Sequence, residues 1–324
     1  MGITIDGNEI SAITIDGEEV QEVTIDGEVA WVAYTPYVYS GSRDNTIRKI
    51  DPNGNQVWEF DGHSDYVNAV ATDKDGYVYS ASDDETVRKI DPNGNQVWEF
   101  DKHGDSVNDV AVDKDGYVYS GGWDRNIRKI DPDGNQVWKY DGQRTVHAVA
   151  VDKDGYVYGG SGILDRTVRK IDPNGNEVWV FDGHSGNIYG VAVDKDGYVY
   201  SVDTDDVVKK IDSDGNEVWE FTGHSDDVYA VAVDKDGYVY SGSRDNTIRK
   251  IDPNGNQVWE FDGHSNDIFA LAVDKDGYVY SASMDNTVRK INPDGNQVWS
   301  FDGHSEDVEG VAVAPGTVGA GFWD

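Results

Sequence analysis

Hydrophobic and polar positions alternate in short runs along most of the chain, and the runs recur with a fixed period. The pair Val-Trp ends at seven tryptophans spaced by 40, 40, 41, 40, 40 and 40 residues: Trp58, Trp98, Trp138, Trp179, Trp219, Trp259 and Trp299. Each unit holds four β-favouring runs, VxxVAV, YVYSGS, TIRKID and VWEF, and none keeps a helical apolar period. Four strands repeated at this period predict the blade of a β-propeller.

Two kinds of turn, DKDG and DPNGN, separate these runs. Asp and Asn tolerate the left-handed backbone of tight turns, and glycine adopts a positive φ without a Cβ clash. A calcium loop would need a bidentate glutamate about twelve positions along, and DKDGYVY runs straight into a strand instead. We therefore interpret both motifs as hairpin turns and expect no specific metal site or cofactor, although loosely bound cations stay an alternative.

Counting the runs predicts how the ring closes. The first kind of run begins seven times, at Val67, Val107, Val146, Ile188, Val228, Ile268 and Val308. The other three kinds also occur seven times, but their first copies, from Tyr37 onward, precede every run of the first kind. We expect an all-β, seven-bladed propeller over residues 32–324, built of four-stranded antiparallel blades, whose last blade is closed by both chain ends.

Residues 1–31 follow a different rule. ITIDGNEI, ITIDGEEV and VTIDGEVAW recur every ten residues, each with an Asp-Gly turn between two short runs. This pattern predicts small β-hairpins, which have too little core to be stable alone. We expect them to pair with the propeller or with another chain, and we interpret them as a docking module through which a homo-oligomer could also form. The alternative is a passive cap or linker.

The 40-residue unit resembles the WD-repeat family of β-propellers over residues 32–324. The GH dipeptide of that family is present at His63, His184, His224, His264 and His304, and its turn aspartate at Asp44, Asp84, Asp124, Asp165, Asp205, Asp245 and Asp285. In the family these residues, a strand serine and the tryptophan of the WD pair form a buried hydrogen-bonded tetrad. Isoleucine, as at Ile50, replaces that tryptophan here, so the resemblance implies structural His and Asp residues in an incomplete tetrad. The tryptophan of NxVW instead resembles quinoprotein-type repeats, without implying a quinone site.

The net charge limits the classes of partner that we expect. Asp and Glu number 62 and Lys and Arg 27, which gives a net charge of −35, and there is no cysteine. Such a surface repels nucleic acid and anionic membranes, and it is typical of adaptation to concentrated salt. An acidic-ligand or calcium-rich environment is the weaker alternative. No run approaches the length of a membrane span, and the start MGITIDGNEI shows no signal peptide. We expect the repeated Arg-Lys pair to neutralise aspartates between blades.

Catalysis is not indicated by the recurring Ser, His and Asp. A catalytic triad is a single constellation with an exposed nucleophile, whereas a set repeated around a ring is structural. No polar cluster outside the repeat is visible in the sequence, so we expect no enzymatic activity. His147 stands outside the pattern, in TVHAVAV, and we interpret it as a packed or ring-facing residue rather than a ligand.

The positions at which the repeats differ are free to specialise. They lie before the turn aspartate and within the first strand, two places that neighbour each other on the entry side of a blade. The candidate binding face drawn from them is Arg43, Trp123, Arg244, Met284, Tyr189, Tyr229 and Phe269. Clustered aromatic and arginine side chains are typical of recognition surfaces. The alternatives are sequence drift after duplication and aromatic side chains that fill the central channel.

The hairpins of residues 1–31 resemble short modules of structural proteins of tailed viruses, including those of salt-loving archaea. This resemblance implies a virion location and a surface or tail component that contacts a host surface protein or glycan, or other virion proteins. The alternative is an intracellular protein-interaction scaffold in the cytoplasm of a halophile. The near-identity of the units also fits a designed protein, but irregularities such as GGSGILDRT and SVDTDDVVKK favour a natural one.

Overall fold

The computed structural model describes residues 36–314 except 143 and 163, together with the backbone of short strands nearer the N-terminus. The chain divides into two compact units, Met1–Pro36 and Tyr37–Asp324, so the boundary lies slightly beyond the expected one at residues 31 and 32. In the part of the chain that is described, no helix is long and apolar enough to cross a membrane.

The first unit contains three two-stranded antiparallel sheets. They are formed by β1 (Thr4–Ile5) with β2 (Asn8–Glu9), β3 (Thr14–Ile15) with β4 (Glu18–Glu19), and β5 (Glu22–Ile25) with β6 (Glu28–Val32). In each sheet the two paired strands flank one Asp-Gly pair of the ten-residue repeat in the sequence, as the hairpin pattern predicts.

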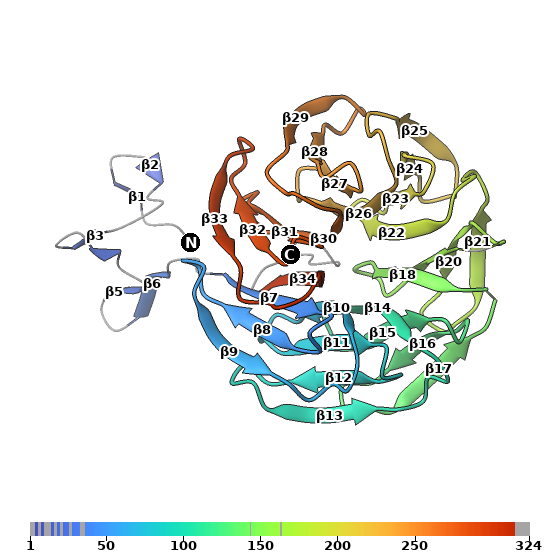
Figure 1. Cartoon of the computed structure of the whole chain (residues 1–324), viewed down its shortest axis with the longest axis horizontal. Helices are drawn as coiled ribbons and strands as arrows, with labels where there is room; N and C mark the ends of the chain where they lie inside the picture. The colour runs from blue at the N-terminus through green and yellow to red at the C-terminus, as the bar shows by residue number, and fades with distance from the viewer. Residues whose placement is uncertain are drawn as a thin grey trace. The chain divides into compact units, whose positions relative to one another are not determined.

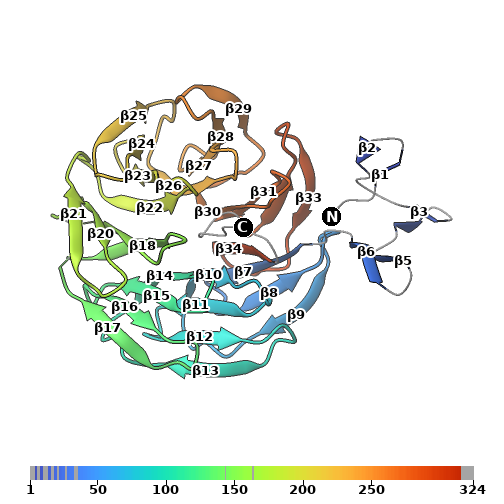
Figure 2. The same ribbon diagram turned by 180° about the vertical axis from the view of Figure 1, so that it is seen from behind.

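The second unit is a ring of seven four-stranded antiparallel sheets, which we number as blades 1 to 7 (Figures 1 and 2). Blade 1 contains β34 (Val308–Ala314), β7 (Tyr37–Ser42), β8 (Ile47–Ile50) and β9 (Gln56–Phe60). Blades 2 to 4 contain β10 (Val67–Thr72), β11 (Val78–Ser82), β12 (Val87–Ile90), β13 (Gln96–Phe100), β14 (Val107–Val112), β15 (Val118–Gly122), β16 (Ile127–Ile130), β17 (Gln136–Tyr140), β18 (Val146–Val151), β19 (Val157–Ser161), β20 (Val168–Ile171) and β21 (Glu177–Phe181). Blades 5 to 7 contain β22 (Ile188–Val193), β23 (Val199–Asp203), β24 (Val208–Ile211), β25 (Glu217–Phe221), β26 (Val228–Val233), β27 (Val239–Ser243), β28 (Ile248–Ile251), β29 (Gln257–Phe261), β30 (Ile268–Val273), β31 (Val279–Ser283), β32 (Val288–Ile291) and β33 (Gln297–Phe301).

Blade 1 closes the ring. Its innermost strand β34, from the C-terminal end, pairs antiparallel with β7, with Val311 opposite Ser40. The remaining blades take their four strands consecutively from the chain. The prediction of seven blades closed by both chain ends is therefore confirmed, since strands from the two ends of the propeller pair within one sheet.

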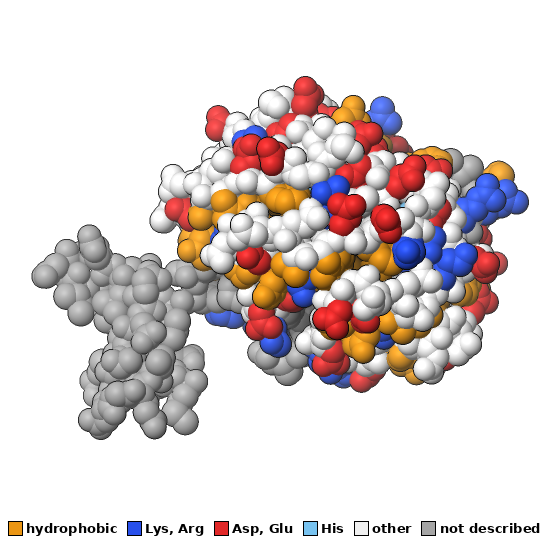
Figure 3. Space-filling model, turned by 90° about the horizontal axis from the view of Figure 1, so that it is seen from below, with side chains coloured by type: hydrophobic (Ala, Val, Ile, Leu, Met, Phe, Trp, Pro, Cys, Tyr) orange, Lys and Arg blue, Asp and Glu red, His pale blue; other side chains and the backbone are white. Residues whose placement is uncertain are grey.

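The hydrophobic core lies between neighbouring blades. Tyr79 and Phe100 of blade 2 pack with Val110, Val118 and Ile130 of blade 3, and equivalent clusters occur around the ring. The outer strands carry half-exposed valines such as Val57, and orange side chains lie in bands among the acidic and basic ones on one side of the ring (Figure 3). Burial of apolar surface between blades is the main force that holds such a ring together.

A repeated tryptophan also joins each blade to the next. The indole Nε1 of Trp58 donates to the backbone oxygen of Pro92 at 3.1 Å, and Trp299 donates to Pro52 at 3.0 Å across the closure. The ring of Trp58 lies against Gly94, where φ is +90° and a Cβ would approach to 3.2 Å. The DPNG turn thus needs glycine for its backbone and for the contact with the tryptophan.

The turn carboxylates are used within the chain. In blade 2, Oδ1 of Asp73 accepts from the amides of Asp75 and Tyr77, and its Oδ2 accepts from the Tyr79 hydroxyl at 2.9 Å. The DPNGN turn is similar, since Oδ1 of Asp51 accepts from the amides of Asn53 and Asn55. These bonds account for the recurring aspartates as turn residues.

The Arg-Lys pairs do not act as expected. Arg88 pairs with Asp84 and Glu99 of its own blade, at 3.4 and 3.1 Å, rather than across two blades. Lys49 lies over the ring of Tyr37 at 4.2 Å and donates to the oxygen of Pro92 in the next blade. The expectation of inter-blade neutralisation of aspartates was wrong, because the strand register places the arginine beside its own turn and the lysine over its own tyrosines.

Candidate functional site

A buried chain of hydrogen bonds fixes six of the blades. In blade 2, His63 lies 2.8 Å from Asp84 through Nδ1 and 2.7 Å from the Ser80 hydroxyl through Nε2. The same arrangement occurs at His103–Asp124–Ser120, His184–Asp203–Ser201, His224–Asp245–Ser241, His264–Asp285–Ser281 and His304–Asp44–Ser40. The serines are fully buried, so they cannot serve as exposed nucleophiles, and the arrangement is a structural element.

These pairs set the protonation of the aspartates. Burial by itself raises the pKa of Asp84, but hydrogen bonds from His63 and Thr86 outweigh it and hold that pKa well below its usual range. On the histidine side, burial lowers the pKa of His264 even though Asp285 opposes it. A neutral imidazole between a carboxylate and a hydroxyl satisfies every partner, which explains why the group tolerates complete burial.

Two of the sequence assignments need correction, and one residue was missed. His184 bonds to Asp203, two residues before the expected Asp205, whose own amide donates to Asp203 instead. Asp165 has no histidine partner among the described residues and pairs with Arg169 at 3.3 Å. His103 belongs to the buried set although it follows lysine rather than glycine. Its distance of forty residues from His63 is the signal that could have found it.

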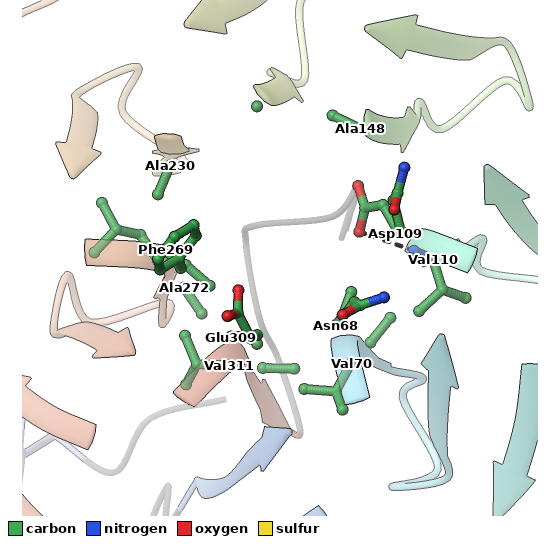
Figure 4. Close-up of a pocket in the computed structure, with 18 of the residues that line it drawn as sticks. Asn68, Val70, Asp109, Val110, Ala148, Ala230, Phe269, Ala272, Glu309 and Val311 are labelled. Atoms are coloured by element: carbon green, nitrogen blue, oxygen red, sulfur yellow. Dashed lines mark hydrogen bonds between the residues drawn. The ribbon is translucent and has the colours of Figure 1, made fainter. Parts of the chain in front are cut away.

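The innermost strands enclose a central channel, which contains a cavity of about 270 Å³. The second residue of each innermost strand contributes to a ring around this cavity. The members of the ring are Glu309, Asn68, Asn108, His147, Tyr189, Tyr229 and Phe269. Asn68, Asp109, Phe269 and Glu309 surround the same opening (Figure 4). The first-strand positions that vary between repeats are therefore the walls of one site.

Aromatic side chains form a continuous arc along this ring, which we call the aromatic arc and define as Trp123, His147, Tyr189, Tyr229 and Phe269. Successive ring centroids lie 5.9, 4.6, 5.2 and 4.9 Å apart, and the last two rings are stacked in parallel. Trp123 begins the arc and is 44% exposed. The aromatic residues thus line the wall and leave a cavity, instead of filling the channel.

The other predicted face residues lie around this opening. Arg43 pairs with Glu309 at 2.5 Å and with Asp307 at 2.9 Å. Arg244 lies within 4.0 Å of Asp226, Asp227 and Asp267, and is half exposed. Met284 is partly buried, and its amide donates to the oxygen of Asp267 at the entrance to the first strand. None of the three lines the cavity in the described structure. The predicted face therefore consists of residues that line the cavity and of these three residues, which lie outside the lining.

Sequence reasoning missed Asp109, the most unusual residue of the lining. The equivalent position in the other blades holds alanine four times and glycine twice: Ala69, Ala148, Gly190, Ala230, Ala270 and Gly310. Its carboxylate accepts from the amide of Val149 in the next blade at 2.7 Å and from Val110 at 2.8 Å, and burial raises its pKa to about 7. The expectation that no polar cluster lies outside the repeat was wrong, because the ring brings Asp109, Asn68 and Glu309 together from separate blades.

The titratable groups of the lining are all shifted by burial. Burial raises the pKa of Glu309 to about 7, although Arg43 opposes this shift. Burial lowers the pKa of His147 to about 4, so its ring is neutral, and its Nε2 has no hydrogen-bond partner in the described structure.

A cluster of three carboxylates, Asp206, Asp226 and Asp227, lies outside this lining, with Arg244 beside two of them.

Comparison with known proteins agrees with this architecture. The PQQ_2 family, described as outer membrane protein assembly factor BamB, matches residues 43–165, 164–274 and 227–320. The chain belongs to this family. Among solved structures, the WD40 β-propeller domain of Doa1 is similar, with a TM-score of 0.71 and 22% identity over 78% of this chain and 88% of that one. No curated protein matches the chain. At this identity the likeness to the Doa1 domain shows the propeller fold.

The family name raises the question of a quinone cofactor. A quinone that carries carboxylates needs cationic side chains around it. Among the described residues that line the channel cavity, the charged ones are Asp109 and Glu309, and none is lysine or arginine. The donor set therefore does not fit an anionic quinone, and we derive no chemistry from one.

Proposed function

We propose that this protein is a non-enzymatic binding protein that recognises a partner protein at the mouth of its central channel. The observation that supports it is the aromatic arc, in which five rings from successive blades lie in contact along the channel wall. Rigid aromatic side chains give large contact areas at a low entropic cost, which is why they dominate recognition surfaces. The assembly-factor description of the family is consistent with a propeller that acts by holding other proteins.

For the biological setting we propose a surface or tail component of a tailed virus of a halophilic archaeon. The net charge of −35 and the TIDG repeats of residues 1–31 support this setting. Residues 1–31 dock the protein to the particle, and the channel mouth contacts a host surface protein or glycan, or another virion protein. A cytoplasmic scaffold of a halophile is the second candidate, because the same aromatic arc would serve a cellular partner equally well.

The test is binding of the purified full chain to intact haloarchaeal cells in concentrated salt. We expect saturable binding that is lost in Trp123→Ala and retained in Val57→Ala, which removes a similarly exposed apolar side chain from the outer rim. A chain lacking residues 1–31 should still bind cells but fail to join particles. Binding that depends on Val57 and not on Trp123 would refute recognition at the channel mouth. No cell binding, together with capture of cytoplasmic proteins through Trp123, would favour the scaffold.

A further inference from the structure

We propose that the channel mouth takes one basic side chain, an arginine or a lysine, from the partner protein. This inference deepens the proposed function and rests on it, since it specifies which part of the partner enters the ring. It follows from the shape of the cavity, the charges of its wall and the composition of the rest of the chain.

The cavity has two unlike sides. Blades 4 to 7 contribute the aromatic side through His147, Tyr189, Tyr229 and Phe269, and blades 1 to 3 contribute the polar side. Phe269, Asn68 and Glu309 project around the same opening (Figure 4). A volume of about 270 Å³ holds one long side chain rather than a folded domain.

The polar side carries negative charge without enough cations to balance it. Asp109 and Glu309 are the charged residues of the described lining, and neither lysine nor arginine is among them. Asp109 is held by two backbone amides and has no cationic partner within the described residues. Arg43, at the border, pairs with both Glu309 and Asp307, so a single cation serves two carboxylates. A carboxylate desolvated in this way is stabilised by an incoming cation.

The aromatic side suits the same ligand. Cationic groups are attracted to the faces of aromatic rings, and the planar guanidinium of arginine also stacks on them. The neutral ring of His147 adds no positive charge that would repel such a group. Arginine or lysine can therefore satisfy both sides of the cavity at once, whereas an acidic or purely apolar side chain satisfies only one or neither.

The two segments that flank the described propeller in the sequence offer no basic side chain. Residues 1–36 and 315–324 contain no lysine and no arginine. A second copy of the chain is a poor donor, because two molecules with a net charge of −35 repel each other. These two observations favour a different protein as the donor of the basic side chain.

The experiment measures binding of the tripeptide Ac-Gly-Arg-Gly-NH2 to the full chain by isothermal titration calorimetry. Its twin contains citrulline, which keeps the shape of arginine and lacks its charge. The titrations are done near pH 8 in about 1 M KCl, where screening within about 3 Å removes the general attraction of an acidic surface for cations. We expect the arginine peptide to bind at least about tenfold more tightly than the citrulline peptide, as a charge-assisted hydrogen bond requires.

Two variants locate the binding. Asp109→Ala introduces the residue that four other blades already carry, so the fold should tolerate it, and we expect it to weaken the arginine peptide at least about tenfold. Asp115→Asn removes an exposed carboxylate from a DKDG turn and should leave the affinity unchanged. Equal binding of the two peptides, or an Asp109→Ala variant that binds like wild type, would overturn the proposal.

The remaining outcomes are also decisive. If light scattering shows that the wild type self-associates and Asp109→Ala does not, the occupant is a second copy and the proposal fails. If cells bind through Trp123 while the peptides show no charge preference, the proposed partner-binding function is supported and the proposal of a basic side chain in the channel is refuted. If the arginine peptide binds through Asp109 while Trp123→Ala leaves cell binding intact, the binding site in the channel is supported and its role in host contact is refuted.

Discussion

The buried framework and the channel mouth of this propeller obey opposite rules. In the framework the same residues recur from blade to blade, and their polar atoms are paired, as in His224 with Asp245 and Ser241. At the channel mouth the equivalent positions change from Asn68 to His147 to Phe269, and polar groups are left without full partners. Repetition therefore marks residues that hold the ring together, and its absence marks residues that are free to bind.

Blade 4 shows what happens where the framework is not copied. Gly159 occupies the position of the strand serine, and Oδ2 of Asp165 has no hydrogen-bond partner among the described residues. The same blade contributes His147, whose ring fits only because Gly162 has no Cβ, which would approach Nε2 to 2.2 Å. The blade that departs most from the repeat thus also anchors part of the aromatic arc.

Breaking the framework should have the largest effect. His224→Ala leaves the buried Ser241 hydroxyl and the Asp245 carboxylate without their shared partner, and we expect a loss of about 3 kcal/mol in the free energy of unfolding. The matched control is His147→Asn, which installs the residue that blades 2 and 3 carry at the channel mouth. The control should lose about 1 kcal/mol or less. Denaturant titration followed by tryptophan fluorescence measures both, and equal losses would refute the distinction.

Replacing Asp109 should raise the free energy of unfolding rather than lower it. Its folded-state pKa of about 7 lies above the usual value for aspartate, so the folded protein holds this proton more tightly and loses stability as pH rises between about 4 and 7. We expect Asp109→Ala to stabilise the protein by about 1 to 3 kcal/mol at pH 8 and to have little effect at pH 4.5. Thermal unfolding at both pH values tests this, and a variant destabilised at pH 8 would show that the carboxylate is a structural group.

The link between blades should give a smaller loss. Trp58→Phe keeps the apolar ring but removes the Nε1 donor to the oxygen of Pro92, and we expect about 1 kcal/mol of destabilisation. Val57→Ala, on the same outer strand but exposed, should change stability by less than about 0.5 kcal/mol. Similar unfolding midpoints for the two variants would show that the indole hydrogen bond contributes nothing.

The smallest effect on stability belongs to the aromatic arc. Phe269→Asn again uses a residue that the chain carries at this position in other blades, and it removes the parallel stack on Tyr229. We expect a loss of about 0.5 to 1 kcal/mol from the missing aromatic pair, together with loss of partner binding. The comparison is sharpened by measuring unfolding and cell binding on the same preparation. A strongly unfolded variant would place Phe269 in the framework.

Most of the fold could be predicted from the sequence, whereas the site could be predicted only in part. The 40-residue period and its turns specify seven blades because each strand run meets its neighbour through short hairpins. The aromatic members of the mouth were also found, since they vary against a constant background. The role of Asp109 was missed, and so was the pairing of His184 with Asp203 in place of Asp205. Both depend on which side chain faces inward at a bulge or turn, and a shift of one or two residues there changes the partner.

The sequence by itself determined the strand order, the closure of blade 1 and the identity of the repeated residues, because these depend on local periodicity and on pairing between neighbouring runs. Only the tertiary structure decided that Glu309, Asp109, His147 and Phe269, which lie as far as 200 positions apart, share one cavity. Ring closure brings the innermost strands together around a single axis, and burial there shifts the pKa values of the acidic groups. Neither the shared axis nor the loss of solvent is encoded in any one repeat.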